Sequence, residues 1–168
     1  MRYHPDDSHR SMCRSAMHGQ RPRHGVLTVE VALIMPVFVL FLAALLEFGH
    51  YFWVKHMLTA AARAGARLGS YEGVNNVDVV NRVLQVASVA VDPSVALVII
   101  RNGSVFDTAS VNPGSINYET LPALDLSQAT SATCFVVQVS VPYDSVALLP
   151  PFWIKNKTVY GRAVMRHE

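Results

Sequence analysis

The feature that most constrains this chain is a long apolar run that follows a basic N-terminal segment. Residues 26–54 are dominated by Val, Leu, Phe and Ala, and residues 31–46 carry no ionisable side chain. As a helix this uncharged stretch would be about 24 Å long, and its apolar flanks extend it past the ~30 Å hydrocarbon core of a bilayer. The sequence therefore predicts one transmembrane helix close to the N-terminus.

Charge on either side of the apolar run predicts its orientation. Residues 1–25 contain five arginines against two aspartates, and Arg21 and Arg23 directly precede the run. Positive charge favours the cytoplasmic side, and aromatic residues such as Tyr51, Phe52 and Trp53 are typical of the opposite interface. We expect a single-pass protein with a cytoplasmic N-terminus and an extracytoplasmic C-terminal domain.

Composition limits what the rest of the chain can be. Of 168 residues, 51% are hydrophobic and 15% are charged, and the net charge is +2. The low charge suits a membrane-associated chain with one modest core, and it gives no reason to expect a nucleic-acid partner.

Helical character is expected to continue beyond the membrane to Gly69, because residues 55–69 are rich in Ala, Leu and Arg and lack proline. Ala61, Gly65 and Gly69 recur every four residues and would leave a smooth helix face. Packing of this face against the protein's own sheet is favoured over a subunit interface. A second helix is expected over residues 77–91, with Asn75 as its N-cap. The face expected to be apolar comprises Val80, Val83, Leu84 and Ala87.

The remainder predicts strands and loops. Residues 95–100 are expected to pair with residues 104–108 through an Asn102-Gly103 hairpin turn. Residues 134–141 alternate and should be half buried, with Gln138 and Ser140 on the polar side. Residues 158–166 alternate too, whereas residues 121–132 and 142–157 predict loops. The expected fold class is α+β, with a long N-terminal transmembrane helix followed by a small antiparallel sheet domain. The expected parts are a leader (1–25), the helix (26–69) and the extracytoplasmic domain (70–168).

The most informative residues lie where the basic leader meets the apolar run. Glu30 sits at the edge of the hydrocarbon, where a carboxylate costs roughly 2.5–3.5 kcal/mol and so needs a partner or a task. Cleavage after Gly25 would expose an α-ammonium group on Val26, and Glu30 could pair with that charge in the same or a neighbouring subunit. Pro36 falls inside the span, where it predicts a tolerated helix kink.

These residues resemble a known family. Gly25 followed five residues later by Glu30 is similar to the signal cut by prepilin peptidases, and residues 29–36, Val-Glu-Val-Ala-Leu-Ile-Met-Pro, resemble the opening of TadE-like pseudopilins. The Ala/Arg-rich residues 60–67 and the C-terminal residues 163–168, Ala-Val-Met-Arg-His-Glu, are also similar to that family.

The resemblance implies a minor pseudopilin of the tight-adherence (Flp) type IV pilus system, held in the bacterial inner membrane and cut between Gly25 and Val26. The implied partners are the prepilin peptidase, other pilins and pseudopilins, and the tight-adherence secretion machinery. The implied task is support of pilus growth and adherence. A TadF-like relative, methylation of Val26 and incorporation into the pilus are left open.

Enzymatic chemistry is not expected. The sequence lacks GxSxG, CxxC and HExxH motifs, His167 is the single histidine after Ser70, and no cofactor or metal site is indicated. Cys134 is expected to be a buried, unreactive thiol. Glu47 and His50, three residues apart on the helix, are expected to form a partly hydrated pair.

Two alternatives remain. The chain could be a single-span anchor for an extracytoplasmic binding domain, or a secreted protein whose apolar run is a signal peptide. The mature N-terminus distinguishes them from the pseudopilin.

Overall fold

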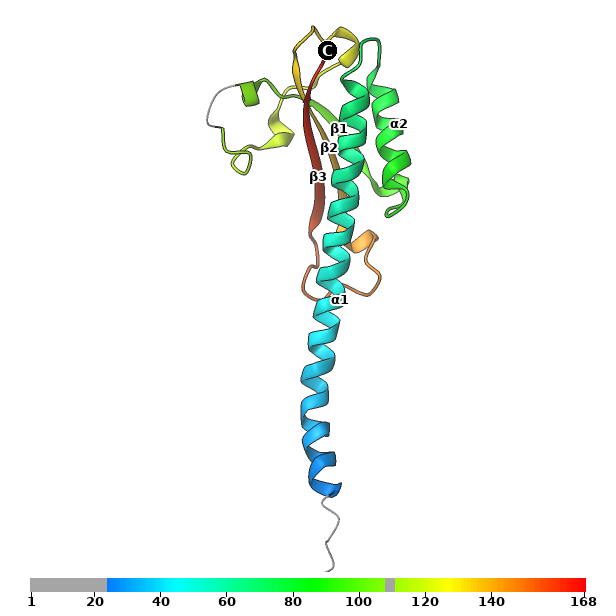
Figure 1. Cartoon of the computed structure of the whole chain (residues 1–168), viewed down its shortest axis with the longest axis vertical. Coiled ribbons are helices and arrows are strands. Elements are labelled where there is room, and N and C mark those ends of the chain that lie inside the picture. The colour runs from blue at the N-terminus through cyan, green and yellow to red at the C-terminus, as the bar shows by residue number, and fades with distance from the viewer. Residues whose placement is uncertain (1–23, 108–110) are drawn as a thin grey trace, which may run out of the picture. The chain divides into compact units, whose positions relative to one another are not determined.

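A computed structural model describes residues 24–107 and 111–168, with side chains from Leu27 onward. Most of the predicted leader, residues 1–23, lies outside the described residues. The main elements are α1 (His24–Gly69), α2 (Asn76–Ala87), β1 (Leu97–Asn102), β2 (Cys134–Pro142) and β3 (Thr158–Arg166) (Figure 1). A long apolar helix and a small antiparallel sheet confirm the predicted α+β class.

The chain divides into two compact units, the first ending at Val39 and the second comprising Leu40–Glu168. The described part of the first unit is helix alone. The second unit contains the rest of α1, α2 and a three-stranded antiparallel sheet in the order β1-β2-β3. The central strand pairs Val137 with Ile100 of β1 and Phe135 with Met165 of β3.

Within the second unit, α1 packs against the sheet through a stripe of fully buried residues. They recur every three or four residues, with Ala61 and Ala62 adjacent, and so lie on one helical face. They are Val54, Leu58, Ala61, Ala62 and Ala66. The closest approach is at Gly161 of β3, where an added Cβ would lie 2.6 Å from the backbone N of Thr59 and closer still to the backbone of Leu58. The small-residue face was expected to pack on the protein's own sheet, but it contacts α2 as well. An added Cβ at Gly65 would meet Val79 and Val83 of α2, and one at Gly69 would meet Val79 of α2 and Phe135 of β2.

Helix α2 begins as the sequence predicts. The side chain of Asn75 accepts a hydrogen bond from the Asp78 N–H at 3.0 Å, and the Asp78 carboxylate accepts one from the Asn75 N–H. This reciprocal capping box satisfies two otherwise unpaired N–H groups. Val83 and Ala87 are buried as expected, but the third buried residue is Val79, and Val80 and Leu84 are half-buried. The helix packs on α1, where Gly65 accommodates the side chain of Val83, and it ends at Ala87 rather than at residue 91.

The predicted hairpin at Asn102-Gly103 is wrong. The segment Ser104–Asp107 forms a 3₁₀ turn, and the partner of β1 is the distant strand β2. The favoured two-residue hairpin turn of an Asn-Gly pair requires positive φ at both positions, and neither residue adopts it here. Instead the Asn102 side chain accepts a hydrogen bond from the Ser104 N–H, and the Gly103 N–H bonds the Cys134 carbonyl.

The prediction that β2 is half buried is also wrong, since both of its faces are covered. Phe135, Val137 and Val139 face the helices, while Val136 packs with Tyr118 and Leu121 on the opposite face. On that second face Gln138 is 1% exposed. Its side-chain oxygen accepts a hydrogen bond from Arg162, whose guanidinium group lies 4.0 Å from the centre of the Tyr118 ring.

Candidate functional site

The predicted processing site lies at the start of the described helix. Gly25 and Val26 fall within the first turn of α1, and Glu30 follows on the same helix with its side chain exposed. Val26 and Glu30 are four residues apart, so they share one helix face. Side chains on an α-helix incline toward its N-terminus, which directs the Glu30 carboxylate toward the turn that contains Val26. Cleavage and the pairing of Glu30 stay predictions.

Pro36 lies inside α1, and the chain is helical on both sides of it. A kink at Pro36 stays a prediction.

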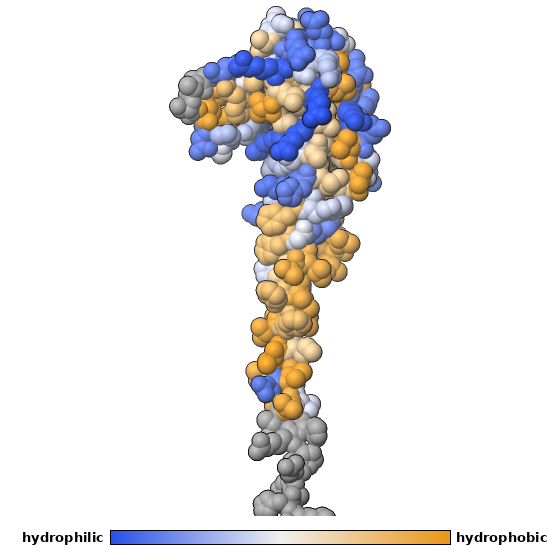
Figure 2. Space-filling view, viewed as in Figure 1, coloured by the Kyte–Doolittle hydropathy of each residue, from blue (hydrophilic) through white to orange (hydrophobic). Residues whose placement is uncertain are grey.

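The outer surface of the helix after Glu30 is apolar. Among the described residues, one helix is long and apolar enough to cross a membrane, the Leu27–Gly69 part of α1, and its most apolar stretch is not buried in the protein. The 20 residues from Leu27 to Leu46 rise about 30 Å as a helix, which matches the hydrocarbon thickness of a bilayer. Figure 2 shows hydrophobic side chains along the helix and many polar ones over the sheet domain. This surface suits attachment to a membrane.

The apolar surface ends at Glu47, which the structure places in an unexpected role. Its carboxylate accepts hydrogen bonds from three consecutive backbone N–H groups of the 142–157 loop: Phe152 at 3.1 Å, Trp153 at 3.0 Å and Ile154 at 2.7 Å. Glu47 is only 9% exposed. Hydrogen bonds to a charged acceptor are stronger than neutral ones, so these three compensate for removing the carboxylate from water. Glu47 therefore fastens the loop to α1.

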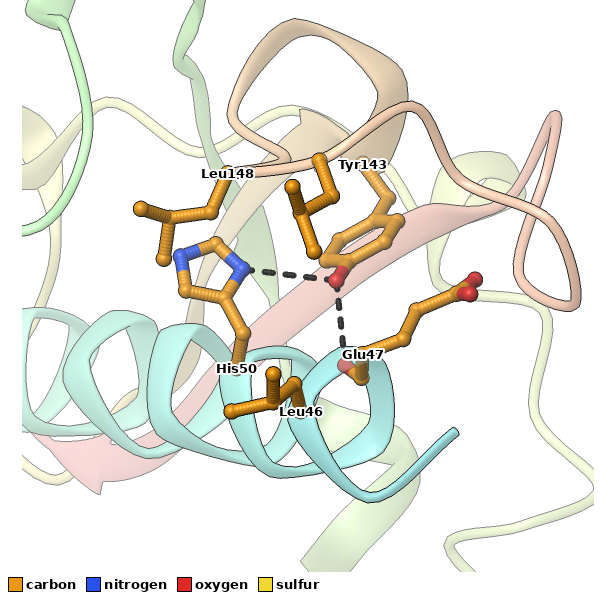
Figure 3. Close-up of a pocket in the computed structure, with 6 residues that line it drawn as sticks. Leu46, Glu47, His50, Tyr143 and Leu148 are labelled. Carbon is orange, nitrogen blue, oxygen red and sulfur yellow. Dashed lines mark hydrogen bonds between the residues drawn. The ribbon is translucent and has the colours of Figure 1, made fainter. Parts of the chain in front are cut away.

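Tyr143 makes a second connection between the loop and α1. Its hydroxyl donates a hydrogen bond to the Glu47 carbonyl oxygen at 3.1 Å and lies 3.3 Å from His50 Nδ1 (Figure 3). Because the single phenolic proton goes to Glu47, His50 Nδ1 must be the donor in the other bond. Burial, and then the negative charge of Glu47, raise the pKa of Tyr143.

The expected Glu47–His50 pair is not what forms, because each side chain has a partner in the loop instead. The i,i+3 spacing that suggested the pair is local, whereas the actual partners lie 93 to 107 residues away in the sequence. Glu47 directly follows the apolar run, and this position in the sequence indicates that its carboxylate needs a polar partner. The sequence did not identify that partner as backbone.

A half-open pocket of about 210 Å³ adjoins these contacts. It is lined by Leu46, Glu47, His50, Tyr143, Leu148 and Leu149 (Figure 3). Typical small-molecule sites measure ~300–1,000 Å³, so this pocket is small for a substrate site. Its lining is mainly apolar, and its polar groups are already hydrogen-bonded to one another or to the loop.

The candidates for chemistry elsewhere are occupied by structural contacts. Cys134 is a buried free thiol, and burial, followed by the charge of Asp107, raises its pKa, which disfavours the reactive thiolate. His167 is 5% exposed, and its Nδ1 lies 3.2 Å from the Gly69 carbonyl oxygen. Within residues 24–107 and 111–168, no three His, Cys, Asp or Glu side chains gather in a way that could hold a metal ion.

Comparison with known proteins supports the resemblance drawn from the sequence. Residues 25–67 match the family described as TadE-like protein, which confirms the resemblance over that stretch. No curated protein and no solved structure matches the chain. The matched stretch contains most of the helix that is long and apolar enough to cross a membrane.

Proposed function

We propose that this chain is a TadE-like minor pseudopilin that a prepilin peptidase cuts between Gly25 and Val26 and that supports biogenesis of the tight-adherence (Flp) pilus and adherence. The observation that carries the proposal is the family match, which begins at Gly25 and covers the apolar helix. The match begins at Gly25, the residue that the proposed cut follows, and leaves out the preceding basic segment.

Topology follows from charge. The arginine surplus of residues 1–25 holds the leader in the cytoplasm, which keeps the cut accessible to a peptidase of the inner membrane. Residues 26–69 serve as anchor and assembly helix, and residues 70–168 lie outside the membrane. The last turns of α1 also belong to the core of that domain, because Leu58, Ala62 and Ala66 are fully buried there.

Glu30 is the assembly residue in this proposal. After cleavage the new α-ammonium group of Val26 would begin the helix, and a carboxylate near a helix N-terminus is favoured by the helix dipole. The shared face of Val26 and Glu30 makes an intramolecular pair feasible. The exposure of Glu30 leaves it equally accessible to the α-ammonium group of an adjacent subunit. In either arrangement, two charges that are costly in hydrocarbon compensate each other.

The function proposed is assembly rather than catalysis. The buried titratable groups of the described domain serve its architecture: Glu47 fastens a loop, and His167 contacts the end of α1. The family match points in the same direction, since it covers a helix associated with the pilus. The partners we propose are the prepilin peptidase, pilins and pseudopilins, and the tight-adherence secretion machinery in the inner membrane.

Processing is tested by Gly25→Phe, with Gly19→Phe as the matched control in the same leader. A peptidase that must accommodate a small, flexible residue at the cut should leave the Gly25→Phe chain at full length. The Gly19→Phe chain should be trimmed normally, because the residue five positions after Gly19 is His24 rather than a glutamate. Mass spectrometry of the purified membrane protein reads both N-termini.

The same measurement separates the alternatives. A wild-type N-terminus at Val26 supports the pseudopilin, a start beyond Leu46 would support a secreted protein, and an untrimmed chain would support a simple membrane-anchored binding domain. Normal trimming of the Gly25→Phe chain would contradict the proposed cut.

A further inference from the structure

The loop that Glu47 holds presents large apolar side chains to the outside. Leu148 is 78% exposed, Leu149 56%, Phe152 77% and Trp153 42%. Four such residues within six positions form an exposed apolar patch of the kind that marks an interaction surface. We call these four residues the loop patch.

The loop is fixed in place. Ile154, directly after the loop patch, is buried in the core, and the Tyr143 N–H bonds the Lys157 carbonyl at 2.8 Å across the base of the loop. The Asn156 N–H bonds the Asp144 carboxylate at 2.9 Å. Together with the three bonds to Glu47, these contacts hold the exposed side chains on an ordered backbone.

The loop lies beside the apolar surface of α1, and this position indicates what the loop patch contacts. Glu47 directly follows the apolar residues Leu40–Leu46 of the same compact unit, and Leu46 lines the pocket together with Leu148 and Leu149. The loop patch is thus continuous with the lipid-facing surface of the helix at the level where that surface ends. Leu46 is also the last residue of the uncharged apolar run, so this level corresponds to the outer boundary of the hydrocarbon.

The composition of the loop suits that boundary. Tryptophan is enriched at the level of the lipid headgroups, and lysine near a span extends its ammonium group toward the phosphates. Lys155 and Lys157 are exposed and follow Trp153 within four residues. An apolar patch next to cations is the pattern of a segment that lies in the membrane interface.

We propose that the loop patch inserts into the extracytoplasmic leaflet of the membrane that α1 crosses, giving the domain a second attachment beside its helix. The Glu47 bonds satisfy the loop's backbone N–H groups, which would otherwise be costly to bring to the edge of the hydrocarbon. Two attachments fix the tilt and rotation of the domain on the membrane. This inference rests on the proposed membrane orientation, and it does not depend on processing at Gly25.

The test uses the full chain reconstituted in vesicles of phosphatidylethanolamine and phosphatidylglycerol. The protein contains two tryptophans, so Trp53→Phe leaves Trp153 as the single reporter and Trp153→Phe leaves Trp53 as its matched control. Quenching is measured with lipids brominated near the headgroup or deep in the chain, and with acrylamide in the water. Trp53 lies seven residues beyond Leu46 on α1, about 10 Å farther along the helix. A boundary at Leu46 therefore puts Trp53 beyond the headgroup layer of about 5–7 Å, and not in the interface that the sequence predicts for it.

We expect shallow bromines to quench Trp153 at least twofold more strongly than Trp53, and acrylamide to quench Trp153 less than Trp53. Adding Leu148→Ser and Phe152→Ser should abolish the difference without unfolding the domain, because both side chains are already exposed. Equal access of acrylamide to both tryptophans would overturn the proposal. Protection of Trp153 from both quenchers would also overturn it and would indicate a protein partner.

Flotation of the vesicles after an alkaline wash reports helix insertion separately. Attachment without quenching of Trp153 overturns the docking of the loop alone. Loss of attachment overturns the membrane anchor itself, and with it the proposed function.

Discussion

The contact between Gly161 and α1 makes Gly161→Ala a sharp test of how the domain is packed. An added methyl group would meet the backbone of Leu58 and Thr59, 2.6 Å from the Thr59 nitrogen. Ordinary contacts of this kind are about 3.5–4.0 Å, so α1 would have to move away from β3 by roughly 1 Å. Helical backbone cannot rotate aside as a side chain can, and the displacement would loosen the whole buried stripe of α1.

This displacement would lower the free energy of unfolding. Overpacking of a well-packed core costs about 1–3 kcal/mol, and a clash with rigid backbone belongs at the upper end of that range. A loss of about 3 kcal/mol corresponds to a fall in the melting temperature on the order of 10 °C for a domain of this size. Gly49→Ala is the matched control on the same helix, because an added Cβ there meets nothing within 4 Å. It should be neutral or stabilise by about 0.5–1 kcal/mol, since alanine favours helix over glycine.

Thermal unfolding of the full chain in detergent measures both variants. The signal should be near-ultraviolet circular dichroism, which follows the packing of the domain's aromatic residues, because we expect the apolar part of α1 to stay helical in micelles. A melting temperature for Gly161→Ala within 2 °C of the wild type would refute the close packing of α1 on β3. An equal loss in Gly49→Ala would show that the helix is sensitive to any added methyl group.

Two further predictions concern charge. Glu30→Gln should leave membrane insertion and cleavage intact but reduce piliation, because an α-ammonium group on Val26 would lose its charge partner. The variant is tested at wild-type expression in a strain lacking the native copy. Full piliation and adherence there would show that Glu30 is only an interfacial acid. The pKa of Tyr143 is raised above its ordinary value near 10, so the folded state keeps the phenolic proton after the unfolded state loses it, and stability should fall as pH rises above about 10. Tyr143→Phe should show a smaller decline than the wild type in chemical denaturation between pH 9 and 11, and parallel declines would contradict this.

Much of the secondary structure could be predicted from interactions between residues that are close in the sequence. Asn75 was identified as the N-cap of α2 because an amide side chain can accept from an N–H three residues later, a contact within one turn. The end of α1 at Gly69 and the strand over residues 158–166 follow from equally local patterns. The segment 25–67 was predictable for the same reason: charge, hydropathy and the position of Glu30 relative to Gly25 are properties of neighbouring residues.

The wrong predictions concern residues whose partners are far away in the sequence. The pair Asn102-Gly103 is typical of a hairpin turn. In the structure, however, β1 pairs with β2, which includes Phe135, and the residues after Gly103 form a 3₁₀ segment. Gln138 suggests a polar face, yet Arg162 and Tyr118 cover it from elsewhere in the chain. Glu47 was assigned to its neighbour His50, whereas backbone N–H groups more than a hundred residues away bind it. Contacts between such distant residues produce no hydrophobic periodicity, so they could not be predicted from the sequence.

The pairing of α1 with β3 has a mechanical consequence. The two elements run in the same direction, with Gly161 beside Leu58 and His167 beside Gly69, and the Glu168 N–H bonds the Ser70 carbonyl at 2.8 Å. Tension applied along the part of α1 that lies in this unit would therefore act on its contacts with β3 as shear. Contacts loaded in shear must give way together, whereas contacts that are peeled apart fail one at a time. The contacts between α1 and β3 would therefore resist such a pull together.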